Sequence, residues 1–318
     1  MSIKALYARG DGRDELVELA DWKNRRIPQD HLLWADAVAP DEDDLDVLRR
    51  ALKLSDATVD AIVDRPSAAH ATVLDDGIRI TVMTPGAAPD DDPVPLQVLL
   101  GDEWVVTAHA EPVPFLDEER ERVRDERELG LLTPVQFLAA VLDWHVDAFF
   151  GLAEALEREV DELDDAALGT ERDLLQRLVG TRRRIARARR LLSSHRDLFA
   201  ELQRPDFMPT KEPSEADLLA AVAGRLDRAG EALANAREML IGTFDVHMTR
   251  TAQRTNDIMK VLTLASVILL PASVVAGVMG MNFKLGFFEN PSLFWVVIAG
   301  MAAIAAGTIG FARWRGWL

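Results

Sequence analysis

The chain has 318 residues and a formal net charge of −17, because 53 acidic residues outnumber 36 basic ones. This balance argues against a nucleic-acid-binding protein, since affinity for a phosphate backbone depends on clustered Lys and Arg. The sequence has no cysteine, which excludes a disulfide framework, a thiolate metal site and a thiol nucleophile. Charged residues are concentrated before about residue 260 and the remainder is overwhelmingly apolar, so we expect a large water-soluble part followed by a membrane part.

Short strand-like and helix-like runs alternate over residues 1–130. The expected strands are Leu32–Ala35, Ile78–Val82, Leu96–Leu100 and Trp104–Thr107, and the expected helices lie near Asp43–Leu54 and Asp117–Arg127. This alternation predicts an α/β domain. The first residues lack an apolar stretch of signal-peptide length, so we expect this domain to be cytoplasmic.

Two charged amphipathic helices with a turn near Gly169 are expected within residues 131–213. Val135–Leu163 ends in an acid-rich stretch, and Glu171–Leu202 is rich in arginine. Opposite charges would allow the two helices to pair as a hairpin of the cytoplasmic part. Solvated charged faces explain this composition more simply than a dedicated binding surface does.

Residues 214–260 predict one long stalk helix. Ser214 is a suitable N-cap, and no proline follows it before Pro271. Apolar residues recur at helical spacing, at Leu218, Leu219, Val222, Leu226, Leu233 and Leu240. We expect this helix to continue without a break into the membrane part.

Two uncharged runs are long enough to cross a bilayer as helices. They cover 261–283 and 293–312, with a short loop at 284–292 between them and a basic tail at 313–318. Glycine, asparagine and proline in the loop are typical of a turn. The sequence therefore predicts two transmembrane helices.

Basic residues flank the outer ends of these two runs. Arg250, Arg254 and Lys260 precede the first, and Arg313 and Arg315 follow the second. By the positive-inside rule, both termini face the cytoplasm and the connecting loop faces outward. We therefore expect a protein of the inner, or plasma, membrane, with the lipid bilayer as a partner.

One stripe of the first run carries small and neutral residues. Its members are Asn256, Met259, Leu262, Ser266, Leu270, Ser273 and Gly277. The intervals of three or four residues average about 3.5, the spacing that keeps one seam facing partner helices in a left-handed bundle. A packing seam is the simpler interpretation, because small residues alone permit close approach of helices; a pore lining is the alternative.

The stripe ends at the sequence Gly280-Met281-Asn282. A ring of Asn282 side chains, one from each subunit, would present several amide oxygens around an axis. Mg²⁺ gives up its water reluctantly, so a neutral amide ring suits outer-sphere recognition of the hydrated ion. Gly and Asn also end helices as C-caps, and that alternative stays open.

These residues resemble the CorA family of divalent metal ion transporters. The resemblance is strongest and ungapped from Asn256 to Phe283, and the terminal Arg313–Leu318 is also similar. Leu33–Asp36 resembles the first-strand signature of the family, and the neighbourhood of Arg65 and Pro66 resembles its next segment. Together these segments cover most of the chain.

The resemblance implies an α+β membrane protein that assembles as a homopentameric funnel. Each subunit would have a cytoplasmic αβα domain, a stalk helix that continues into the pore-lining helix, and a second, outer transmembrane helix. By this resemblance the selectivity filter is Gly280, Met281 and Asn282, and the pore and gate are lined by Asn256, Met259, Leu262, Leu270, Ser273 and Gly277. Lys260, Arg313 and Arg315 would form a basic collar, although their topological role explains them equally well.

The sequence also departs from the family pattern. Met279 stands where the family usually has an aromatic residue, and the outer loop lacks the usual Met-Pro-Glu-Leu stretch. Glu289 is therefore the only acidic residue of that loop. Residues 221–225 replace the aspartates that bind regulatory Mg²⁺ in some members, although Asp217 and Asp227 lie nearby.

The leading hypothesis is passive uptake of hydrated Mg²⁺ by a homo-oligomer, with the ion as transported substrate and no cofactor. The six histidines show no ligand spacing and the sequence has no phosphate loop or nucleophilic triad, so we expect neither an enzyme nor direct use of ATP. A Zn²⁺, Co²⁺ or Ni²⁺ transporter of the same superfamily, with or without proton coupling, is the alternative. A membrane-tethered coiled-coil scaffold without a pore is an alternative from a different class.

Overall fold

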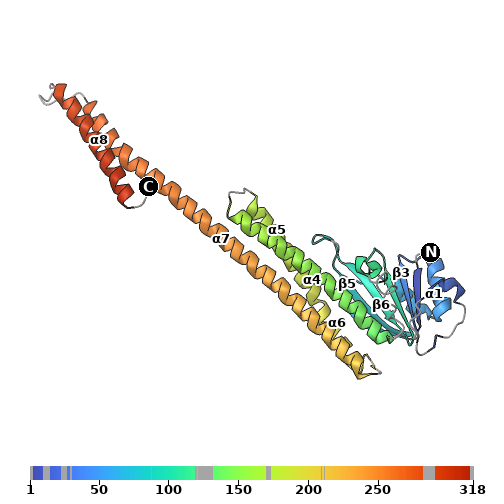
Figure 1. Cartoon of the computed structure of the whole chain (residues 1–318). Coiled ribbons are helices and arrows are strands. Elements are labelled where there is room, and N and C mark those ends of the chain that lie inside the picture. Colours follow the sequence, from blue (N-terminus) through green and yellow to red (C-terminus); the bar gives the residue numbers. More distant parts are fainter. Residues whose placement is uncertain are drawn as a thin grey trace. The chain divides into compact units, whose positions relative to one another are not determined.

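The computed structural model describes residues 3–9, 15–22, 27–28, 31–86, 88–118, 120, 132–169, 173–208, 210, 212–281 and 291–315. The chain divides into two compact units, an N-terminal unit (Met1–Thr243) and a C-terminal unit (Phe244–Leu318). Figure 1 shows the elements of both units.

The N-terminal unit contains a seven-stranded sheet in the order β2-β1-β3-β7-β6-β5-β4. The strands are β1 (Ile3–Arg9), β2 (Glu15–Val17), β3 (His31–Val38), β4 (His70–Leu74), β5 (Gly77–Thr84), β6 (Val94–Leu100) and β7 (Trp104–His109). Neighbouring strands are antiparallel except β3 and β7, which run parallel with Leu33 opposite Trp104. The four strands predicted from the sequence are confirmed as parts of β3, β5, β6 and β7.

Helices cover both faces of this sheet. Alternate residues of β3 point to opposite faces, as a pleated strand requires. Leu32 and Trp34 join the core that also includes Phe137 of α4 (Pro134–Ala167). Leu33 and Ala35 pack instead with α1 (Glu42–Leu52) and α2 (Asp56–Val63). A mixed α/β sheet with long helices is thus confirmed, and Figure 1 shows α1 and α4 on opposite sides of the sheet.

Side-chain caps fix the starts of these helices. Asp41 and Asp44 form a capping box at α1, and Thr133 and Gln136 form another at α4, where Pro134 occupies the first turn. The predicted helix near Asp43–Leu54 is confirmed as α1. Of the predicted helix Asp117–Arg127, residues 117, 118 and 120 are helical, after a helical start at 114, and the other residues lie outside the described part of the chain.

The expected pair of charged helices is confirmed as α4 packed against α5 (Leu174–Ser193), with α6 (His195–Leu202) following after a short break. Ion pairs join the two long helices, because Arg177 pairs with Glu162 and Arg184 pairs with Glu159. Opposite charges therefore meet across this hairpin, as their distribution in the sequence suggested.

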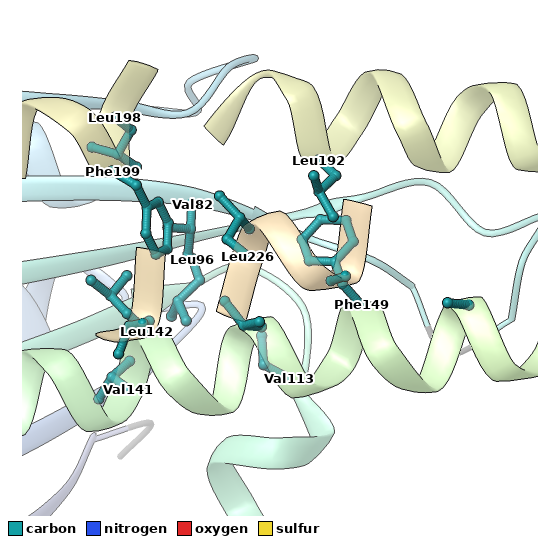
Figure 2. Packing of buried hydrophobic residues seen from close by; sticks show 14 of the residues in the cluster. Val82, Leu96, Val113, Val141, Leu142, Phe149, Leu192, Leu198, Phe199 and Leu226 are labelled. Carbon is teal, nitrogen blue, oxygen red and sulfur yellow. The ribbon is translucent and has the colours of Figure 1, made fainter. Parts of the chain in front are cut away.

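Helix α7 runs from Pro213 to Met279, so the predicted long helix begins one residue before Ser214 and continues into the apolar run as expected. Its part in the N-terminal unit buries residues spaced by three or four along one face. These are Leu219, Val222, Leu226, Ala229, Leu233, Ala236 and Leu240. Figure 2 shows Leu226 among side chains from α4, α5, α6 and the sheet, including Phe149, Leu192 and Phe199.

The C-terminal unit contains the end of α7 and the helix α8 (Pro291–Trp314). By length and composition, three described helices are apolar enough to cross a membrane: α4, α7 and α8. The apolar window of α4 is 44% buried inside the structure, whereas those of α7 and α8 are 0% buried. The apolar residues of α4 are thus largely explained by the core beneath the sheet.

Candidate functional site

The predicted pore-lining residues all lie on α7. Asn256, Met259, Leu262, Leu270, Ser273 and Gly277 fall within its continuous helical part. Met259, Leu262 and Leu270 are 54, 59 and 68% exposed. Their own chain leaves these apolar side chains uncovered, and a face of this kind requires lipid or other helices against it.

Hydroxyl groups on this part of α7 bond back to the helix. Ser266 Oγ donates to the Leu262 carbonyl at 2.9 Å, and Thr263 Oγ1 donates to the Met259 carbonyl at 2.7 Å. Each hydroxyl donates its hydrogen to a carbonyl of the same helix. Its oxygen can still accept a hydrogen bond from water or a polar ligand. The helix therefore presents polar oxygen without charge.

The predicted filter begins at the end of α7. Backbone bonds from Gly280 N to Ala276 O (3.0 Å) and from Met281 N to Val278 O (3.2 Å) close the last turn. A Cβ added at Gly277 would meet nothing within 4 Å, so this chain alone does not require a glycine there. Asn282 and Glu289, the two remaining predicted residues of the outer mouth, lie outside the described residues.

The three residues of the predicted basic collar lie on two helical segments. Lys260 on α7 pairs with Asp257 at 3.0 Å, so its charge is partly balanced. Arg313 belongs to the last turn of α8, and Arg315 follows it with its guanidinium 5.7 Å from the centre of the Phe311 ring. The local position or contact of each residue therefore explains its positive charge as well as the predicted basic collar does.

An arginine occupies the stalk region where some family members carry aspartates. Arg225 pairs with Asp143 and Asp147 of α4 and lies over the ring of Phe150. Burial opposes its charge, but the hydrogen bonds and charges of Asp143 and Asp147 raise the pKa of Arg225 overall. Over the described parts of the chain, no group of three or more His, Asp or Glu is placed to hold a metal ion.

A buried polar cluster surrounds Asp36, in the segment that resembles the first-strand signature of the family. Its carboxylate accepts bonds from Thr107 Oγ1 (2.5 Å), His109 Nε2 (3.2 Å) and Arg120. His109 also donates through Nδ1 to the Glu111 carbonyl at 2.6 Å. Burial alone would lower the pKa of His109, but the hydrogen bond and charge of Asp36 raise it overall, which favours the imidazolium form.

Two histidines that seemed unrelated in the sequence meet in the core. The rings of His145 on α4 and His195 on α6 are 4.9 Å apart. His195 donates through Nδ1 to the Leu191 carbonyl and accepts at Nε2 from the Met83 amide, which fixes it in the neutral form. Burial lowers its pKa to about 4, and burial together with His195 lowers that of His145 well below its usual value. Spacing along the sequence gave no signal for this pair, because the tertiary fold alone brings α4 and α6 together.

A mixed α/β unit that shares one long helix with an exposed apolar unit defines a class of membrane protein. The profile of the family of CorA-like Mg²⁺ transporter proteins matches residues 29–312, so the chain belongs to that family. It is a divalent cation transporter of the CorA type and not an enzyme.

Relatives and solved structures support this assignment. The chain is 25% identical to a cobalt/magnesium transport protein CorA of Methanocaldococcus jannaschii, over 90% of this chain and 92% of that protein. It is 28% identical to a protein of the same name from Thermotoga maritima, over 64% of this chain but only 58% of that protein. The solved structure of the complete CorA from M. jannaschii matches with a TM-score of 0.82 at 21% identity, covering 99% of this chain and 98% of that one. At this identity the structural match shows a shared fold.

Proposed function

We propose that the chain is one subunit of a homopentameric channel that admits hydrated Mg²⁺ to the cytoplasm. The observation that carries this proposal is the apolar part of α7, which is 0% buried by its own chain yet carries a regularly spaced stripe of small and neutral residues. Covering such a surface with copies of the same helix leaves the stripe around a common axis. Contacts within the chain do not require a glycine at position 277. A glycine there would instead allow neighbouring helices to approach closely.

In this proposal Gly280, Met281 and Asn282 form the filter at the outer mouth. Amide oxygens of Asn282 hold the first water shell of the ion, and Glu289 attracts cations to the loop. Met259 and Leu262 form a hydrophobic constriction that closes by dewetting. An inside-negative potential favours entry of a dication by about 4.6 kcal/mol per 100 mV, so no further energy source is needed.

The filter assignment is tested by Mg²⁺ flux into liposomes that contain the full chain. Asn282→Ala removes the amide oxygens and is expected to lower uptake at least about tenfold, as expected when several contacts to the passing ion are lost together. Asn290→Ala is the matched control, because it removes an amide from the adjoining outer loop, outside the motif. Equal uptake by the Asn282 variant and the wild type would exclude this filter.

Two alternatives are distinguished by further measurements. The first alternative is a Zn²⁺, Co²⁺ or Ni²⁺ substrate. It is motivated by a zinc transport protein ZntB of Klebsiella pneumoniae, which is 23% identical over 92% of this chain. Competition of each ion with Mg²⁺ flux identifies the substrate, and the same assay with an imposed pH gradient detects proton coupling. The mass of the detergent-solubilised oligomer tests the scaffold alternative, since a monomer or dimer cannot enclose a five-helix axis.

A further inference from the structure

A groove on the N-terminal unit is lined by five arginines. It has a volume of about 450 Å³ and lies between the α5–α6 segment and α7. Its arginines are Arg182, Arg189, Arg190, Arg196 and Arg237. All five side chains are exposed, and no acidic residue belongs to the described lining. In a chain with a net charge of −17, this concentration of positive charge requires an explanation.

Arginines on the other side of α5 are paired. Arg184 pairs with Glu159 and with Asp90, and Arg187 donates to the Asp90 carbonyl at 3.1 Å. Within the groove, only Arg196 has an acidic partner in the described structure, Asp227 at 3.4 Å. On that side the fold pairs Arg184 with two carboxylates and gives Arg187 a carbonyl acceptor, whereas four guanidinium groups of the groove have no acidic partner in the described structure and can bind a ligand.

The shape of the groove adds to its charge. Gly230 of α7 lies in the lining, and a Cβ there would come within 3.3 Å of Leu192 Cδ2 and 3.5 Å of Arg196 Nη2. Glycine therefore keeps the wall open beside an arginine. Parts of Ile185, Leu192 and Leu240 also line the groove and give it apolar surface between the charges.

These features specify the chemical class of a ligand. Guanidinium groups bind phosphate oxygens through paired N–H donors, and several of them together match several linked phosphates. The volume falls within the range of small-molecule sites, and the apolar wall can hold an uncharged ring. A nucleoside triphosphate without bound metal carries more negative charge than its Mg²⁺ complex, and the lining has no carboxylate that would hold the metal.

We propose that this groove binds a nucleoside polyphosphate, preferentially in its metal-free form. Binding requires no hydrolysis and is independent of the ion that the protein transports. Its test therefore concerns binding alone, and its failure would leave the proposed transport function untouched.

The experiment measures ATP binding by calorimetry to the full chain in phosphatidylcholine nanodiscs. In the presence of a chelator we expect wild-type binding that tripolyphosphate displaces and AMP does not, with weaker binding in excess Mg²⁺. Combining Arg189→Gln with Arg237→Gln is expected to weaken binding at least about tenfold, since two charge-assisted contacts are lost. Arg183→Gln, which changes an exposed arginine of α5 outside the groove, is the matched control and should stay within about twofold of the wild type, because it loses no such contact.

A second measurement does not depend on variants. ATP should protect the groove arginines of the wild type from a guanidine-modifying reagent, while Arg183 continues to react. The proposal is overturned if ATP fails to bind, if the double variant binds it as well as the control, or if protection does not favour the groove. Loss of ATP binding in nanodiscs that contain phosphatidylglycerol would also overturn it in favour of lipid headgroups. A drop in oligomer mass of the double variant with unchanged ATP binding would identify the groove as a subunit interface instead.

Discussion

Asp36 is only 1% exposed, and its carboxylate is bonded to Thr107, His109 and Arg120. Its carboxylate pairs with His109 and with Arg120, so removing the charge leaves His109 without its hydrogen-bonded carboxylate and Arg120 with Asp117 as its acidic partner. Asp36→Asn is therefore expected to lower the free energy of unfolding of the N-terminal unit by about 3–5 kcal/mol. Urea unfolding of the full chain in detergent, followed by tryptophan fluorescence, measures this change.

The matched control for this substitution is Asp46→Asn, which breaks an exposed ion pair with Arg49 in α1. Exposed pairs contribute little, and we expect a loss of at most about 1 kcal/mol. Similar losses for the two variants would show that the Asp36 cluster is not an electrostatically coupled unit.

The neutral state of His195 predicts a dependence of stability on pH. Its pKa is about 4 in the folded chain and about 6.5 when unfolded, so the unfolded state binds the proton more readily between these values. Stability is therefore complete above pH 6.5 and falls as the pH drops towards 4, by about 3 kcal/mol from this residue. The thermal midpoint of the N-terminal unit, followed by near-ultraviolet circular dichroism, should decrease over this range.

His195→Gln provides the comparison, because its amide can accept from the Met83 amide without titrating. We expect a shallower pH dependence between pH 6.5 and 5, with His145 contributing the remainder. An unchanged slope would contradict the assignment. The sequence analysis found no ligand spacing among the histidines, and the contact between His145 and His195 depends on the packing of α4 against α6, which spacing cannot reveal.

At the scale of the element, α7 has a different role in each unit. In the N-terminal unit its apolar stripe is buried, with Leu233 at 0% exposure and Leu218 at 42%. Leu233→Ala should cost about 2–5 kcal/mol of unfolding free energy, since it leaves a cavity in the main core. Leu218→Ala on the exposed side of the same helix should cost less than about 0.5 kcal/mol. Equal costs in urea unfolding would mean that this stripe does not anchor α7.

Long elements were predictable because their patterns are long. The start of α7 was predicted to within one residue, and the strongly apolar strands β3, β5, β6 and β7 were recognised. The short strands β2 and β4 lie at the edges of the sheet, where half-exposed residues weaken the alternation, and β1 was missed as well. The sequence analysis did not identify α4 as a helix apolar enough to cross a membrane. Many of its apolar residues pack in the core of the N-terminal unit.

At the scale of the whole molecule, the absence of cysteine makes topology directly measurable. If only α7 and α8 cross the membrane, Asn290→Cys should react with an impermeant maleimide applied to intact cells. Arg254→Cys and Asp43→Cys should react only after permeabilisation. Reaction of Asp43→Cys from outside, with Arg254→Cys still protected, would mean that α4 also spans the membrane. This result would overturn the proposed orientation.

For the candidate filter and pore, the sequence supports predictions that the structure of one chain does not test. Met259, Leu262 and Leu270 lie in one continuous helix, but their exposure does not distinguish them from Ile258, Val261 or Leu269, so their pore-lining role stays a prediction. The role of Asn282 depends on other subunits and on a loop outside the described residues, so it stays a prediction. A single chain contains no central axis, and only the assembled oligomer can supply one.

Pro271, inside α7, has a consequence for the membrane span itself. Proline has no amide hydrogen, so the carbonyl of Val267, four residues earlier, loses its usual donor. An acceptor left bare in hydrocarbon costs several kcal/mol and must find another donor. In the proposed channel, water of the pore would supply that donor to the Val267 carbonyl, whereas in a closed packing seam a polar group of a neighbouring helix would have to do so.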